Sequence, residues 1–589
     1  MDTTHILKIQ QELAQRTLAE PEYRHKRLYR LVCDAGWLRA GLDAALSNKG
    51  SRTPGIDGIT KAMIEAQADG REKLVQYLRE ELLDRDYRPQ PVVRKYIPKT
   101  NGKLRPLGIA TLRDRTVQAT VKLVLEPIYE SVFYPFSWGF RPLRSTHHAL
   151  SAVRRGPSSP TGGFKWIIEG DIAACFDEID HRLLRHFLKK RIQDQKLLDL
   201  ITQTLRCDIW EAGQVIYPQT GTPQGSVASP LLTNVFLHEF DAWCQRTYRV
   251  RPEWSHLTPS GLHGRRKKEI GGTLIMTRYA DDWVAVWNGS RERAEEIKAE
   301  IKAFLADELK LRLSEEKTLI THIDDGFDFL GYHLVGDKRW SDGRWRLFSR
   351  VPQKAIRRFR DAVNKIARNT FTDEAAAFTA LSGLIRGWGN YYAHAADSRL
   401  MHSLDAFIYQ EMWKFCRHKS GAAGARAVYR KYTLPRHLRE TGYSQLGLVV
   451  GERVIRIPNL SGIPRKDLKL PYPPHPYLQA GRDKVLLPTG MTDERWWDHH
   501  LWVGQEGDRK GQKRMAVEVL ARDATCQICG SQPAREAHHI PTWRELPEHD
   551  PDKALGVCPT CHRQILHGAV KSDGEPGESK GSRRVRASG

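Results

Sequence analysis

The sequence lacks any apolar run close to the roughly 18 residues that a membrane-spanning helix needs, which excludes a membrane-spanning protein. The first residues, Met-Asp-Thr-Thr-His, lack the apolar core of a secretory signal peptide. Asp2, Glu12 and Glu20 are atypical of an acid-poor transit peptide. We therefore expect an intracellular protein with no membrane partner.

Cysteine is also scarce, with nine residues in 589. Five of them lie singly, which excludes the disulfide framework of a small secreted domain and indicates a reducing compartment. The other four form two close pairs, Cys526 with Cys529 and Cys558 with Cys561, with 28 residues between the pairs. Four thiolates at this spacing are typical of a structural Zn²⁺ site, and a disulfide is the alternative.

Acidic residues are in deficit. The chain has 70 Asp and Glu against 93 Lys and Arg, which gives a net charge of +23. Such an excess indicates a polyanionic partner. A 40% apolar share with 9% aromatic residues excludes wholesale disorder. At roughly 150 residues per domain, the length predicts about four domains.

Hydrophobic periodicity predicts a mixed α/β region at the start of the chain. Residues up to about 85 are helical in pattern, 88–108 suit an extended hairpin, and a helical stripe precedes Pro127. A buried strand is expected at 164–171, and two strands at 273–287 surround Asp281 and Asp282. A helix with one apolar face follows at 294–309, whereas the Gly- and Arg-rich piece 251–272 is most simply a surface insertion.

Four separated motifs carry the chemistry. They are Lys99 to Arg115, Asp171 at a strand end with Phe176 after it, Gly-Thr-Pro-Gln-Gly within 220–231, and Tyr279-Ala-Asp-Asp282. A lone Asp-Asp pair in a turn is usually structural. Carboxylates at a strand end and at a tight hairpin can converge, however, and two Mg²⁺ ions about 4 Å apart need such oxygen ligands for phosphoryl transfer.

From about residue 351 the chain is helical and basic. Arg357 and Arg358 lie among many cations around an apolar stripe, and Arg386 opens the box Arg-Gly-Trp-Gly-Asn-Tyr-Tyr392. Trp388 and Tyr392 suit stacking on RNA bases, and the alternative is that Trp388 and Tyr391 are core residues. The basic face would bind phosphates in either case.

These motifs, in this order, resemble the reverse transcriptases and maturases encoded by group II introns, including their C-terminal H-N-H (HNH) endonuclease module. Pro54-Gly-Ile-Asp-Gly58, Phe140-Arg-Pro142 and Phe329-Leu-Gly-Tyr332 extend the match. The resemblance implies an α+β multidomain fold: a right-hand polymerase with a helical N-terminal extension, a helical maturase domain X and a zinc-stapled ββα nuclease module. The implied parts are 1–85 (N-terminal extension and start of the fingers), 86–345 (fingers and palm), 346–445 (thumb and domain X), 446–515 (DNA binding), 516–570 (nuclease) and 571–589 (disordered tail).

The resemblance also implies roles for single residues. Asp171, Asp281 and Asp282 match the carboxylates that hold two Mg²⁺ ions, and Phe176 matches the gate that excludes a ribose 2′-hydroxyl. Residues matched to nucleotide binding are Lys99, Lys103, Arg105, Gln224 and Lys317, and the Gly331-Tyr332 turn matches the primer grip. Arg357, Arg358, Arg386, Trp388 and Tyr392 fall in the RNA-binding domain X.

In the nuclease module, His539 matches the general base, and His538 with His562 or His567 matches the ligands of a divalent metal. Two features depart from the family. No Asn lies between His539 and Cys558, and His562 and His567 are five residues apart, off a common helical face. The zinc fold is unaffected, whereas the nuclease activity depends on how the module compensates for the missing Asn.

The function implied is RNA-directed DNA synthesis, assistance in splicing the parent intron RNA, and DNA nicking that primes reverse transcription during retrohoming. The partners implied are intron RNA, target DNA and dNTPs, in bacterial cytoplasm or an organelle. The alternatives are a splicing maturase with an inactive nuclease module and another bacterial retroelement reverse transcriptase.

Overall fold

A computed structural model describes residues 3–98, 102, 104–155, 163–222, 225–254, 257, 259–338, 345–369, 371–440, 445–464, 473, 475–478, 536–539 and 554–557. The chain divides into two units, residues 1–478 and residues 479–589. Among the described residues, no helix has the length and apolarity needed to cross a membrane.

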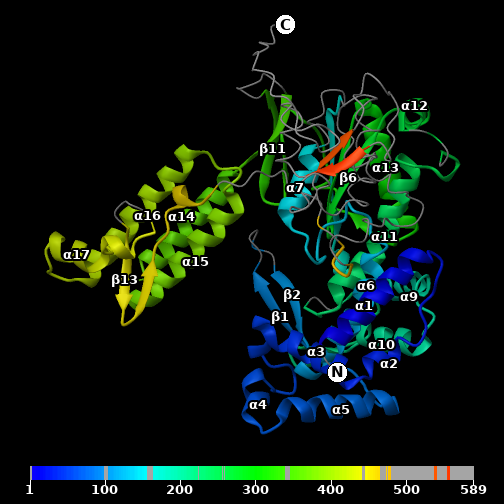
Figure 1. The fold of residues 1–589 in the computed structure, drawn as a ribbon, viewed down its shortest axis with the longest axis horizontal. Coiled ribbons are helices and arrows are strands. Elements are labelled where there is room, and N and C mark those ends of the chain that lie inside the picture. Colours follow the sequence, from blue (N-terminus) through cyan, green and yellow to red (C-terminus); the bar gives the residue numbers. More distant parts are fainter. Residues whose placement is uncertain are drawn as a thin grey trace, which may run out of the picture. The chain divides into compact units, whose positions relative to one another are not determined.

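Short helices at the start of the chain pack around one long helix, α6 (Leu112–Glu130) (Figure 1). The helices packed on α6 are α1 (Thr3–Ala19), α2 (Tyr29–Val32), α3 (Ala35–Ser47) and α5 (Gly70–Asp84). Two further short helices, η1 (Lys49–Arg52) and α4 (Lys61–Ala66), lie between α3 and α5 in the sequence, and α4 contacts α5. Helix α3 can approach α6 closely because Gly41 has no side chain: a Cβ there would lie 2.1 Å from Thr120 Oγ1. The predicted helical start of the chain is confirmed.

Helix α6 continues past Pro127, although the sequence pattern places its apolar stripe before that residue. Proline has no N–H, so the carbonyl of Leu123 loses its helical donor. The side chain of Gln10 replaces that donor, since its Nε2 donates to Leu123 O at 2.8 Å. A side chain from α1 therefore satisfies the carbonyl of α6 that the proline leaves without a donor.

The strands form two sheets that carry the motifs. The N-terminal sheet has the order β2-β1-β4-β5, and the central sheet has the order β6-β7-β3-β8, with β9 also paired to β3. Their bounds are β1 (Val92–Pro98), β2 (Leu104–Ile109), β4 (Ile209–Glu211), β5 (Gln214–Ile216), β3 (Trp166–Ala173), β6 (Leu274–Tyr279), β7 (Asp282–Trp287), β8 (Arg312–Leu313) and β9 (Ile320–His322). The predicted hairpins at 88–108 and 273–287 and the predicted strand at 164–171 are confirmed.

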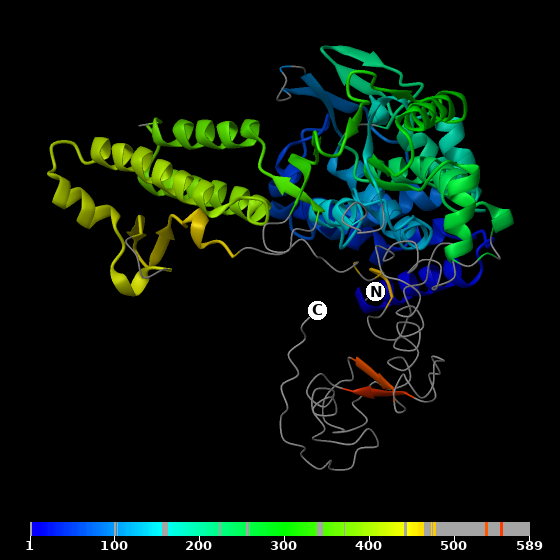
Figure 2. The same cartoon turned by 90° about the horizontal axis from the view of Figure 1, so that it is seen from above.

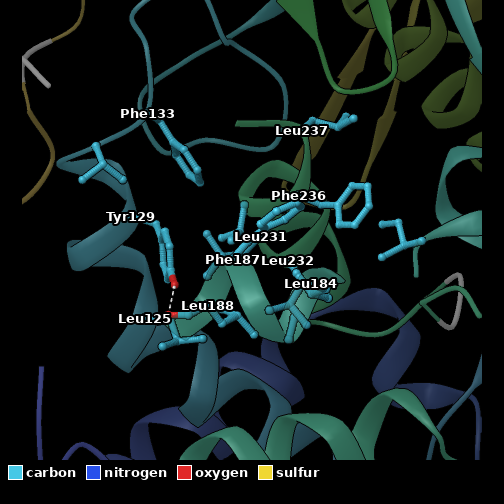
Figure 3. Packing of buried hydrophobic residues seen from close by; sticks show 14 of the residues in the cluster. Leu125, Tyr129, Phe133, Leu184, Phe187, Leu188, Leu231, Leu232, Phe236 and Leu237 are labelled. Carbon is cyan, nitrogen blue, oxygen red and sulfur yellow. Dashed lines mark hydrogen bonds between the residues drawn. The ribbon is translucent and has the colours of Figure 1, made fainter. Parts of the chain in front are cut away.

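Both faces of the central sheet are covered. Ile168, Ala285 and Trp287 belong to the large core beneath the helices, whereas Ile167, Val284 and Val286 belong to a second core on the opposite face. Figure 3 shows the large core where α6, α9 and α11 meet, with Tyr129 Oη donating to Leu188 O at 3.3 Å. The helices of this region are α7 (Thr146–Arg155), α8 (Cys175–Glu178), α9 (His181–Lys189), α10 (Gln195–Leu205), α11 (Ser229–Tyr248), η2 (Pro252–Trp254), α12 (Pro259–Glu269) and α13 (Arg291–Asp307).

Residues 251–272 are more than a surface insertion. They contain α12, which buries Leu262 and Arg266, and Trp254 is buried in the large core. The basic composition hid this contact, because the apolar positions of the segment are few.

A three-stranded sheet leads into the helical region. The sheet order is β10-β11-β12, with strands β10 (Phe327–Phe329), β11 (Tyr332–Lys338) and β12 (Trp345–Arg350). Helices α14 (Gln353–Ala367), α15 (Glu374–Tyr392), α16 (Ser398–Lys419) and α17 (Ala425–Tyr432) follow, and the first three lie side by side (Figure 2). Their apolar faces form a separate core with η4 (Leu460–Gly462) and the hairpin of β13 (Gly447–Val450) and β14 (Arg453–Arg456); η3 (Arg436–Leu438) lies between α17 and that hairpin.

In the second unit, the described residues form one antiparallel strand pair, β15 (Glu536–His539) with β16 (Ala554–Val557). The chain is thus a mixed α/β protein with a helical region after its sheets.

Candidate active site

The central sheet brings three carboxylates together. Asp171 lies on β3 and pairs directly with Asp282, the first residue of β7. Asp281 precedes it in the turn between β6 and β7, where Ala280 has a φ of 59°. Asp171 therefore converges with the adjacent residues Asp281 and Asp282, from which it is distant in sequence, and we call these three residues the carboxylate cluster.

The cluster carries unfavourable negative charge. Burial, together with the charges of Asp281 and Asp171, raises the pKa of Asp282 to about 7. Burial also raises the pKa of Asp281, helped by the charge of Asp171 and opposed by Arg105 and Lys317. Like charges held together in this way favour protonation or a bound cation.

Lys317 supplies one such cation. Its Nζ donates to Asp171 Oδ2 at 2.7 Å, and this hydrogen bond raises the pKa of the lysine. Within the part of the chain that the structure describes, no three His, Cys, Asp or Glu side chains are arranged as a ready-made metal site. The oxygen-only donors and the raised pKa values nevertheless fit a hard divalent cation, which would replace Lys317 as the counter-charge.

One loop with two glycines, Gly221 and Gly225, lies beside Phe176 and the N-terminal sheet. Gly221 has a φ of 88° and packs on the Asp177 carbonyl, while the next residue, Thr222, donates its backbone N–H to Phe176 O at 2.6 Å. Gly225 has a φ of 112°, and a Cβ there would lie 2.5 Å from Gly108 O of β2. The Gly-Thr-Pro-Gln-Gly loop therefore connects Phe176 to the N-terminal sheet.

The structure also describes two other residues predicted to bind the nucleotide, Arg105 and Phe176. Arg105 is exposed on β2, and its charge is felt by Asp281. Phe176 is half-buried beside the loop just described. Three predicted nucleotide-binding residues lie outside the described part of the chain: Lys99, Lys103 and Gln224. So do the predicted zinc ligands Cys526, Cys529, Cys558 and Cys561 and the predicted nuclease residues His562 and His567.

A buried arginine holds the turn of the carboxylate cluster. The Arg278 guanidinium is 0% exposed and donates to both carboxylate oxygens of Asp241, at 2.8 and 2.6 Å. Its Nη1 also donates to Ala280 O at 2.8 Å, which fixes the peptide leading to Asp281. Asn234 and Ser137 accept its remaining hydrogen bonds.

Sequence reasoning missed this network. The available signals were an arginine inside the apolar strand β6 and an aspartate inside the apolar helix α11. Neither signal identifies the other residue as its partner, because 37 positions separate them.

The helical region is joined to the turn after β10. Tyr391 Oη donates to Leu330 O at 2.7 Å, and Tyr392 Oη donates to Gly331 O at 3.1 Å. Leu330 and Gly331 both have positive φ values, 47° and 75°. The end of α15 therefore supports a strained turn that lies next to the central sheet in the second core.

Trp388 and Tyr392 belong to the protein interior rather than to an exposed stacking surface. Tyr392 is 8% exposed, and the Trp388 ring packs on Phe359 and Tyr392 at centroid distances of 4.8 Å in each case. Of the two alternatives that the sequence allows, the structure has the core. Arg357, Arg358 and Arg386 are exposed, and Arg386 pairs with Glu440 at 3.1 Å.

In the second unit, His538 and His539 lie on strand β15, opposite Leu555 and Ala554 of β16. Both histidines therefore lie within an antiparallel strand pair.

Comparisons with known proteins agree with this arrangement. Residues 97–334 match the family model for reverse transcriptase (RNA-dependent DNA polymerase), and residues 356–433 match that for the group II intron, maturase-specific domain. Protein YkfC of Escherichia coli is 40% identical over 364 residues, covering 60% of this chain and 94% of that protein. The group II intron-encoded protein LtrA of Lactococcus lactis is 29% identical over 599 residues, covering 92% and 96%.

A more distant relative is nuclear intron maturase 2, mitochondrial, of Arabidopsis thaliana, at 26% identity over 287 residues, which covers 38% of this chain and 37% of that protein. The match over 97–334, together with the paired carboxylates that this segment contains, identifies the chain as a reverse transcriptase. The chain belongs to the group II intron type of reverse transcriptase and maturase.

Proposed function

We propose that this chain copies RNA into DNA at the carboxylate cluster. The supporting observation is the register of the central sheet, which sets Asp171 against Asp282 with Asp281 in the adjoining turn. These residues would hold two Mg²⁺ ions, which activate a primer 3′-hydroxyl and stabilise the leaving pyrophosphate when bound. In the right-hand description, the N-terminal sheet belongs to the fingers, the central sheet to the palm, and the helical region to the thumb and domain X.

The chain's own residues position the substrate. Arg105 on β2, together with Lys99 and Lys103, would bind the triphosphate, since guanidinium groups match phosphate oxygens in two-point hydrogen bonds. Phe176 would close the space beside the sugar 2′ position, and Gln224 would line the nucleotide pocket. Lys317 would move from Asp171 toward the triphosphate once a cation neutralises the carboxylates.

Primer extension on poly(rA) with an oligo(dT) primer and Mg²⁺ tests the polymerase function. We expect the wild type to incorporate dTTP and Asp281→Ala to incorporate none. A wild type that folds, binds RNA and incorporates nothing would favour the alternative of a splicing maturase without synthesis.

We further propose that the basic surface of the helical region binds the parent intron RNA and assists its splicing. Arg357, Arg358 and Arg386 are among its exposed cations, and Trp388 and Tyr392 pack in the interior of the same region. Because such contacts neutralise phosphates, binding should weaken steeply with salt. The double substitution Arg357→Gln and Arg358→Gln should weaken intron RNA binding and reduce the salt dependence of that binding.

The C-terminal residues would supply the remaining steps. Residues 446–515 would contact target DNA, and 516–570 would form a nuclease module stapled by Zn²⁺ on Cys526, Cys529, Cys558 and Cys561. His539 would act as general base, with His538 and His562 or His567 as ligands of a second divalent metal. The spacing of the cysteines and the β15–β16 pair support this proposal. The nick would provide the primer for copying the intron RNA at its target, as in retrohoming.

His539→Ala tests the nuclease step. We expect loss of strand nicking in target DNA with the zinc content of the protein unchanged. Nicking that persists in this variant would remove His539 from the reaction, and its absence in the wild type would indicate a module that only binds.

A further inference from the structure

Phe140 occupies a conformation that its own packing does not explain. It has a φ of 59°, a region that non-glycine residues rarely adopt, and this large apolar residue is 49% exposed. Both features cost free energy, so the surrounding structure must impose them.

The chain on both sides of Phe140 is held rigidly. The carbonyl of Gly139 accepts a hydrogen bond from Asn234 Nδ2 at 2.8 Å, and a Cβ on Gly139 would lie 2.4 Å from Ala280 N. On the other side, the buried Arg141 guanidinium pairs with Glu130 at 2.9 Å and also donates to backbone carbonyls of the same loop. Phe140 is thus fixed relative to the turn of the carboxylate cluster.

The ring of Phe140 contacts Phe176. The two ring centroids are 6.0 Å apart with an interplanar angle of 84°, an edge-to-face pair. Such pairs have a preferred orientation. Since Thr222 binds the Phe176 carbonyl, the backbone of Phe176 is held by one loop and its ring by another.

We propose that Phe140 is a positioning residue for Phe176 and thereby a second determinant of the choice between deoxyribose and ribose. This inference rests on the proposed polymerase function, in which Phe176 excludes the 2′-hydroxyl. The loop of Phe140 holds the Phe176 ring in one orientation beside the carboxylate cluster. A ribose 2′-hydroxyl would then clash with a ring that cannot rotate to make room.

The test measures kcat/KM for dTTP and UTP in primer extension, for the wild type and for Phe140→Ala, Phe140→Tyr and Phe176→Ala. We expect Phe140→Ala to lower the dTTP-to-UTP ratio between about twofold and tenfold, the range that one aromatic pair supplies. Phe140→Tyr should retain the ratio. A double variant with both Phe140→Ala and Phe176→Ala should have a dTTP-to-UTP ratio no lower than that of Phe176→Ala alone, because Phe140 acts through Phe176.

Leu143→Ala is the matched control. Leu143 lies three residues on, also has a positive φ (58°) and is 57% exposed. Its replacement should leave the ratio unchanged. A Phe140→Ala variant that loses activity toward both nucleotides equally, or not at all, would overturn the inference. A wild type that incorporates neither nucleotide would instead refute the polymerase function itself.

Discussion

Asp282 is the residue whose protonation state the fold alters most clearly within the carboxylate cluster. Its pKa lies near 7 in the folded protein, against an ordinary carboxyl value of about 4 in the unfolded chain. The folded protein therefore binds a proton between these two values that the unfolded chain has lost. The resulting stability is present below about pH 4 and is lost as pH rises through 7.

This linkage predicts how Asp282→Asn behaves without metal. In urea unfolding with a chelator present, the variant should gain stability relative to the wild type on going from pH 5 to pH 8. Added Mg²⁺ should then stabilise the wild type more than the variant at pH 8. A stability difference that does not change with pH would contradict the raised pKa.

Lys317 allows a test of substrate binding separate from folding. Its side chain is 64% exposed, and exposed ion pairs contribute little to stability. Lys317→Ala should therefore unfold like the wild type while raising the KM for dNTP about tenfold, the effect of losing about 1.4 kcal/mol of binding.

Lys310→Ala is the control for Lys317. Lys310 is 61% exposed and pairs at 3.2 Å with Asp180, which is not a member of the carboxylate cluster. Equal KM values for the two variants would show that Lys317 has no special role at the nucleotide.

At the scale of elements, α11 and β6 are joined by the Arg278–Asp241 pair, both members of which are 0% exposed. Asp241→Asn leaves the arginine charge buried without a counter-charge, which should cost about 3–5 kcal/mol of the free energy of unfolding. Chemical denaturation measures this directly.

Asp43→Asn provides the comparison for Asp241→Asn. It removes an exposed pair with Arg71 and should cost no more than about 1 kcal/mol. Similar costs for the two variants would mean that the Arg278 network does not stabilise the turn of the carboxylate cluster.

Helix α15 and the turn after β10 form a second junction between elements. Tyr391→Phe and Tyr392→Phe each remove one hydrogen bond to this turn, at a cost of about 1 kcal/mol. Because the family resemblance assigns this turn to the primer grip, we expect weaker binding of primer–template with the KM for dNTP little changed. Tyr409→Phe on α16 is the control. A higher KM for dNTP with unchanged primer–template binding would contradict the assignment of this turn to the primer.

Local pattern was sufficient for the elements that position the carboxylate cluster. The apolar and β-branched residues of β3, β6 and β7 predicted strands, and the polar Asp281 and Asp282 marked the turn between two of them. The pattern could not predict that Gln10 satisfies the helix at Pro127, or that α12 buries Arg266. It also left open whether Trp388 is exposed. Each of these depends on contacts between residues distant in sequence, which no local propensity encodes.

For the whole molecule, the structure shows where some of the cations behind the net charge of +23 lie. Arg357, Arg358 and Arg386 are exposed on the helical region, and the charge of Arg105 acts on Asp281 in the carboxylate cluster. A polyanion bound along the basic residues would pass a site that itself needs cations. Two activities, RNA binding and DNA synthesis, are thus assigned to different parts of one chain.

The most direct measurement compares these two activities in one variant. Asp281→Asn should abolish incorporation of dNTPs on an RNA template while leaving the splicing rate of the parent intron RNA close to that of the wild type. Loss of splicing together with synthesis, in a protein that unfolds like the wild type, would contradict the division between the carboxylate cluster and the helical region. Retention of synthesis would contradict the assignment of the polymerase site.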